Sequence, residues 1–311
     1  MSNKNKIGSL ILAALSSFSN LLLANDTIVK HQLAQMPNED RKNLSAFLEK
    51  GLTHGCFPYT IFGDKPVSFE VYGLLEAQMG KKLWQQYHQL FQINEFIIKF
   101  QKSEIKNNYF VYLINKKNFL ATVDEHLDLF KNILGPEVGS ERLLHAISQE
   151  QVTFEEVLNN NEGLKGLLLG FGGMSSFQFQ KRNELSKAIC DYLAPPNSFS
   201  ENAFSEQDLQ YITRCKNGFH QIHSSPNEAP ELSLKLKKIY EEFVLIQNKM
   251  QPCCSNTEPL ALFGLPNFVG DNNDPEVQAL LNKYANTRRE IVQAFENGDF
   301  LEVALCKMAQ E

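Results

Sequence analysis

Ionisable side chains gather around a short Gly-Asp-Lys-Pro turn early in the chain. Asp64 and Lys65 lie within the turn, and Glu70 and Glu76 follow it. Paired carboxylates can act as general acid and base where burial separates their pKa values. Turn geometry alone also accounts for an aspartate at this position. We therefore treat Asp64 and Lys65 as candidate catalytic residues, with a purely structural turn as the alternative.

A glycine-rich segment, Gly170–Ser176, offers a second candidate site. Backbone N–H groups attract anions where such a turn opens into a helix, and Ser175 adds a hydroxyl group. The segment matches neither the P-loop nor the G-x-G-x-x-G pattern, and it lacks the G-x-S-x-G of hydrolases. A turn that needs positive φ explains the glycines equally well. Ser175 is therefore a candidate, and no cofactor is predicted.

Two histidines and a cysteine come closest to metal-ligand spacing. His220 and His223 stand three residues apart, with Cys215 upstream. Zinc sites use four ligands, or three and an open position, and helical histidine pairs usually stand four apart. The segment is an expected loop and a third ligand is only inferred. No metal site is predicted, and Cys215, His220 and His223 remain candidates.

Cysteine chemistry could serve either catalysis or cross-linking. A Cys56 nucleophile would need the His54 imidazole within hydrogen-bond reach of its sulfur, which closeness in sequence does not supply. A buried or disulfide-bonded Cys56 is the favoured interpretation. The six cysteines allow 15 pairings, among which the sequence does not choose: Cys56, Cys190, Cys215, Cys253, Cys254 and Cys306.

The first 24 residues have the layout of a cleavable export signal. Lys4 and Lys6 precede an apolar run that ends at Ala24, and a polar segment begins at Asn25. A membrane span needs about 20 mainly apolar residues, whereas serines and an asparagine interrupt this run. An uncleaved anchor and a core helix are the alternatives. We expect cleavage after Ala24 and a soluble mature protein that is periplasmic or secreted.

Composition limits the partners of the mature chain. The formal net charge is −6, and it becomes −8 once the signal, with its two lysines and no acid, is removed. Nucleic acids and anionic membranes favour clustered Lys and Arg, which this chain lacks. Hydrophobic residues make up 43%, a globular composition. The expected partner is an unknown protein or a small-molecule ligand, with no nucleic acid and no membrane span after signal cleavage.

The periodicity of apolar residues predicts a mainly α fold with a small β component (α+β). We expect helices packed around a short hairpin or small sheet, formed from residues 59–72 and 109–114. Expected helices span residues 37–52, 82–100, 117–134, 140–148, 153–159, 180–192, 232–250 and 275–296, with a last short one after Asp299. The expected parts are a mixed region (25–193), a linker or long loop (194–230) and a helical C-terminal part (231–311). The first and last of these parts could form one continuous domain.

Five short segments spread over the chain serve as landmarks. They are Phe62-Gly63-Asp64-Lys65-Pro66, Leu169-Gly170-Phe171-Gly172, Phe179-Gln180-Lys181-Arg182, Leu265-Pro266-Asn267-Phe268 and Asp274-Pro275-Glu276. Through them the chain resembles a poorly studied family of exported proteins of unknown function from host-dependent intracellular bacteria. The resemblance implies a bacterial envelope or secreted setting, and it contributes no catalytic residue.

The sequence thus indicates an exported protein in which no complete set of catalytic residues can be recognised. We expect a binding or interaction protein of the bacterial periplasm or of the secreted fraction. The alternative is a hydrolase or transferase in which the Asp64/Lys65 region and the Gly170–Ser176 turn meet in a cleft. A structural component of the envelope is a third possibility.

Overall fold

The computed structural model describes residues 25–103, 107–193, 234–252, 263, 265–266, 268–296 and 298–310. The expected signal at 1–24, the expected linker at 194–230 and the metal candidates Cys215, His220 and His223 lie outside these residues.

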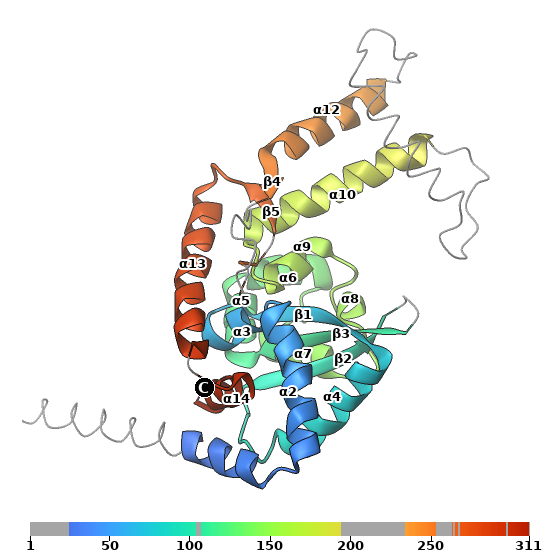
Figure 1. The fold of residues 1–311 in the computed structure, drawn as a ribbon. Coiled ribbons are helices and arrows are strands. Elements are labelled where there is room, and N and C mark those ends of the chain that lie inside the picture. Colours follow the sequence, from blue (N-terminus) through green and yellow to red (C-terminus); the bar gives the residue numbers. More distant parts are fainter. Residues whose placement is uncertain are drawn as a thin grey trace, which may run out of the picture.

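Helices make up most of the described chain, and strands form two small sheets (Figure 1). The helices are α2 (Asn38–Thr53), α3 (Phe57–Phe62), α4 (Leu74–Tyr87), α5 (Lys116–Glu125), α6 (Leu127–Leu134), α7 (Ser140–Ser148), α8 (Phe154–Val157), α9 (Glu162–Leu168), α10 (Gly173–Leu193), α12 (Leu234–Lys249), α13 (Pro275–Phe295) and α14 (Phe300–Gln310). Residues 25–35 are also helical. The strands are β1 (Val67–Gly73), β2 (Phe96–Lys102), β3 (Asn108–Asn115), β4 (Met250–Pro252) and β5 (Val269–Asp271). The expected mainly α fold with a small sheet is confirmed.

The larger sheet is antiparallel with the strand order β1-β3-β2. The Asn115 N–H donates to the Pro66 carbonyl, and the Leu74 N–H donates to the Asn107 carbonyl. Hydrogen-bonded pairs alternate along an antiparallel ladder, so the even-numbered residues of β1 bond to β3. The backbone groups of the odd-numbered residues, from Val67 to Gly73, therefore point away from the sheet. β1 is an edge strand of this sheet (Figure 1).

Each face of this sheet supports its own hydrophobic cluster. Tyr72, Val111 and Leu113 belong to a cluster built mainly with the 25–35 helix, α2, α3, α4, α13 and α14. Val67, Tyr112 and Ile114 belong to a second cluster with α5, α6, α7, α8 and α9. The alternation follows from the period of two along a strand. Side chains of α13 and α14 thus share a core with those of α2 and α4.

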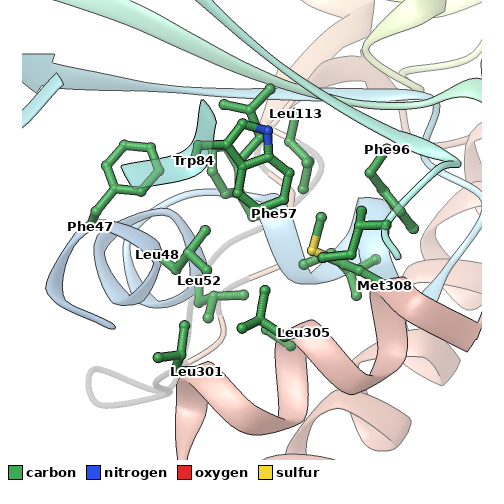
Figure 2. Packing of buried hydrophobic residues seen from close by; sticks show 14 of the residues in the cluster. Phe47, Leu48, Leu52, Phe57, Trp84, Phe96, Leu113, Leu301, Leu305 and Met308 are labelled. Carbon is green, nitrogen blue, oxygen red and sulfur yellow. The ribbon is translucent and has the colours of Figure 1, made fainter. Parts of the chain in front are cut away.

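The first and last described helices pack together. Val29 and Leu33, from residues 25–35, are 0% and 2% exposed in the first cluster. The Asn25 side chain donates to the Ala309 carbonyl at 2.8 Å. Figure 2 shows how Leu305 of α14 points toward the side chains of α2 in the same cluster. Residues 25–35 are therefore part of the core.

The expected strand at residues 59–62 is wrong, because this segment is the short helix α3. Pro58 lies in its first turn, where the missing N–H costs nothing. Thr60 and Asn115 then join the helix to the sheet, since the Asn115 side chain donates to the Thr60 carbonyl. Tertiary burial of Phe57 and Tyr59 has outweighed the local preference of β-branched and aromatic residues for strands. The expected 59–72 hairpin is replaced by pairing between β1 and β3.

The expected helix at 82–100 is also wrong in its second half. Helix α4 starts earlier, at Leu74, and ends at Tyr87, and residues 96–102 form β2. Gln92 has φ +57°, which interrupts the helical path between them. Other boundaries agree with the expectation: β3 covers residues 109–114, and Asp274 caps α13 by accepting from the Glu276 N–H at 2.8 Å. None of the described helices is both long enough and apolar enough to cross a bilayer.

We predict that Leu33→Ala lowers the free energy of unfolding by about 2–5 kcal/mol, because it empties a buried site in the shared core. Leu75→Ala is the matched control, since Leu75 is 78% exposed. Urea unfolding followed by the fluorescence of Trp84, the single tryptophan of the chain, measures both. Equal stability of Leu33→Ala and the wild type would show that residues 25–35 are dispensable to the fold.

Candidate functional site

A pocket of about 520 Å³ lies along the outer edge of β1. Its lining residues come from the α2–α3 turn, β1, α9, the start of α10 and β5: His54, Gly55, Cys56, Phe69, Glu70, Glu162, Lys165, Gly166, Leu169, Phe171, Ser175, Ser176, Phe179, Phe268 and Val269. Phe69 and Glu70 point to opposite faces of the sheet, as successive strand residues do. A pocket that contacts both must lie across the strand edge.

Aromatic rings form much of the wall. Phe171 and Phe268 stack with ring centroids 5.7 Å apart and an interplanar angle of 15°. Phe69 lies 5.7 Å from the Tyr112 ring, which places it over the second core cluster. The Arg182 guanidinium lies 4.6 Å from the Phe179 ring centroid, and Arg182 is not a lining residue. The surface offered to a ligand is thus mainly apolar with a few polar groups.

The Gly170–Ser176 turn supplies one side of this pocket. Gly170 and Gly172 have φ of +72° and +78°, a region that glycine adopts without steric cost. The Glu276 carboxylate accepts from the Gly173 N–H at 2.7 Å and from the Met174 N–H at 3.2 Å. The helix start that the sequence suggested for an anion therefore already holds a carboxylate of the chain itself. Ser175 lines the pocket and is 2% exposed.

Lys65 is buried directly behind the wall, with 3% of its surface exposed. Its Nζ donates to the Leu169 carbonyl and lies 4.5 Å from the Phe171 ring centroid and 5.8 Å from that of Tyr284. The Tyr284 hydroxyl in turn donates to the Gly170 carbonyl. Burial lowers the Lys65 pKa from its ordinary 10.5 to about 8. The Lys65 amine thus holds the α9–α10 turn against the residues that immediately precede β1.

Asp64 lies apart from the pocket lining. Its carboxylate pairs with the Lys283 ammonium, and 64% of the Asp64 side chain is exposed. The neighbouring acids have local roles, because Glu70 accepts from the Val71 N–H at 2.8 Å and Glu76 pairs with Lys50 at 2.9 Å. The structure therefore brings Ser175 to the pocket wall and Lys65 behind it, but it places Asp64 on the surface.

Cys56 and His54 both line the pocket, and Cys56 is a free thiol. Burial is the main cause that raises the Cys56 pKa, the Lys65 charge opposes it, and Glu70 adds to it. A raised pKa keeps the sulfur protonated, whereas thiol nucleophiles need the thiolate. Cys306 is also a free thiol, and burial raises its pKa to about 12.

A hydrogen-bonded network anchors α9, which forms the remaining wall. Lys165 pairs with Glu155 at 2.7 Å, and the same carboxylate accepts from Gln101 at 2.7 Å and from Tyr112 at 3.2 Å. The Gln101 amide oxygen accepts from the Phe154 N–H at 2.7 Å. The Glu155 carboxylate thus links Lys165 of α9 to Gln101 of β2 and Tyr112 of β3.

Sequence reasoning missed the aromatic residues of the pocket. Phe69, Phe171 and Phe268 are far apart in the chain, and an isolated phenylalanine carries no site signal. All five landmark segments meet at or beside the pocket, through Lys65, Phe171, Phe179, Phe268 and Glu276. In the part of the chain that the structure describes, no group of three or more His, Cys, Asp or Glu side chains could hold a metal ion.

No protein-family model, no curated protein and no solved structure matches this chain.

We predict that Lys65 makes stability depend on pH between about 8 and 10.5. The folded pKa is the lower one, so in this range the unfolded chain binds more protons and the free energy of unfolding rises with pH. Lys65→Met should remove this rise and should change the free energy of unfolding little at pH 7.5, because relief of the buried charge offsets the loss of about 1–3 kcal/mol with the bond to the Leu169 carbonyl. Urea unfolding at pH 7.5 and 9 measures both effects.

Lys283→Met is the matched control for this measurement. The Lys283 side chain is 46% exposed, and its exposed ion pair contributes about 0–1 kcal/mol. This variant should keep the pH dependence of the wild type. The same slope in Lys65→Met and the wild type would contradict the assignment to Lys65.

Proposed function

We propose that the protein is a ligand-binding protein that acts outside the cytoplasm, in the bacterial periplasm or as a secreted protein. The observation that carries this proposal is the pocket beside β1. Its volume of about 520 Å³ lies in the range of binding sites, and its apolar walls with few polar groups are typical of them. The expected export signal and the resemblance to exported proteins support the location.

The polar groups of the pocket favour binding over catalysis. The Cys56 thiol has a raised pKa, and the Glu276 carboxylate already accepts from the first N–H groups of α10. Asp64, the suggested partner of the Gly170–Ser176 turn in a hydrolase or transferase, pairs with Lys283 instead. A binding role needs only the shape and the apolar surface that the lining residues provide.

We predict that a neutral solvatochromic dye such as Nile red binds saturably at this pocket. Val269→Trp adds bulk to a lining residue and should weaken dye binding about tenfold or more, since the larger side chain takes up the space of the ligand. Dye fluorescence titration gives the dissociation constants.

Val292→Trp is the control, because it makes the same change at a residue of α13 that is 36% exposed and lies outside the pocket lining. It should bind the dye as the wild type does. Urea unfolding of both variants separates loss of the site from loss of the fold. Unchanged binding in a folded Val269→Trp variant would refute the assignment of the pocket.

A further inference from the structure

The outer edge of β1 carries backbone hydrogen-bonding groups that have no partner in the sheet. The outward N–H groups of Val71 and Gly73 donate to the carboxylates of Glu70 and Glu76 at 2.8 and 3.1 Å. Among the residues that the structure describes, none bonds to the outward N–H or carbonyl of Phe69. Unpaired groups on a strand edge are a template for an added strand.

The open part of this edge coincides with the pocket. Val67 and Ser68, at the start of β1, are 0% and 1% exposed and lie under α3. Phe69 is only partly buried, and Val71 is 39% exposed. An extended chain laid along Phe69–Val71 would bond to the strand and would place one side chain among the aromatic walls. Strand addition with a side-chain pocket is a general mode of peptide recognition.

The charged groups at the pocket favour one sign of charge in the ligand. Glu70 and Glu162 line it, and no cation pairs with either of them in the described part of the chain. Among the described lining residues the one lysine is Lys165, and Glu155 pairs with it at 2.7 Å. The Lys65 ammonium is buried behind the wall, and Arg182 lies outside the lining. The charges that a ligand meets in the lining are therefore the carboxylates of Glu70 and Glu162, and complementary charge favours basic partners.

We propose that the pocket recognises an extended peptide segment that adds to the edge of β1, with one large apolar side chain in the pocket and basic residues on either side of it. This inference rests on the proposed function of the pocket as a binding site. It commits to a foreign peptide rather than a second copy of the chain. Antiparallel pairing of two β1 edges in the register that pairs Phe69 with Val71 would place Glu70 directly opposite Glu70 of the second copy, which is unfavourable.

The first test is the variant Val71→Pro. The Val71 N–H points away from β3 and donates to the Glu70 carboxylate, so proline removes that contact but no bond of the ladder, and proline is tolerated at strand edges. The fold should persist, as measured by circular dichroism and urea unfolding. Peptide affinity should fall about tenfold or more, because the ring also blocks the approach of an added strand. Val71→Ala is the control, because it changes the same side chain and keeps the backbone N–H.

The probe is an array of peptides of the form acetyl-Lys-Xaa-Xaa-Xaa-Lys-amide, with a matched array in which glutamate replaces both lysines. Binders should appear in the lysine array with a large apolar residue at one position. The glutamate versions should bind about tenfold more weakly, and this difference should shrink at high salt. Glu70→Gln with Glu162→Gln should also reduce the difference.

Each other outcome overturns a defined part of the proposal. Peptide affinity that Val71→Pro leaves unchanged refutes strand addition. Failure of every peptide to bind while Nile red still binds refutes the peptide ligand and leaves the proposed function standing. Loss of both dye and peptide binding refutes both. A dimer of the wild type that Val71→Pro converts to monomer, seen by light scattering, makes the second copy the occupant and refutes the foreign peptide.

Discussion

The buried ammonium of Lys65 is the interaction on which the site depends. Removing a charge from water is costly, and no carboxylate among the described residues pairs with this one. Its compensation comes from the Leu169 carbonyl, which is 104 residues away in sequence, and from the rings of Phe171 and Tyr284. These partners compensate the charge only when β1, the α9–α10 turn and α13 are all in place. The buried Lys65 charge thereby favours one relative position of β1, the α9–α10 turn and α13. The pocket lies between β1 and the α9–α10 turn.

The same arrangement leaves β1 at the edge of its sheet. Natural proteins protect such edges with charged side chains that discourage pairing between copies. Here Glu70 and Glu76 cover two outward N–H groups, whereas the groups of Phe69 remain unused. The protection is thus incomplete at Phe69, whereas Val71 and Gly73, whose N–H groups are covered, do not line the pocket. If β1 served only the fold, a charged side chain could also cap the outward backbone groups of Phe69 at little cost in stability.

Helix boundaries with local causes could be predicted from the sequence. Asp274 and Pro275 mark the start of α13, and Gly135 ends α6 with φ +110°. The predictions for residues 59–62 and 96–100 are wrong because short apolar runs fit the period of a helix and that of a strand equally well. Burial against distant segments decides which of the two forms. For the site, the sequence singled out Lys65 and Ser175 but not their surroundings. Phe69 acquires its role from the register of β1 with β3, a long-range property that no local pattern encodes.

The contact between residues 25–35 and α14 has a consequence for when the chain can fold. One core cluster takes Val29 from the beginning of the described chain and Leu305 from its end, both fully buried. Synthesis delivers the first of these long before the second, and contacts between remote residues form late. Until residues 300–310 have left the ribosome, the cluster lacks one of its walls. The first cluster can therefore be completed only after α14 has been synthesised.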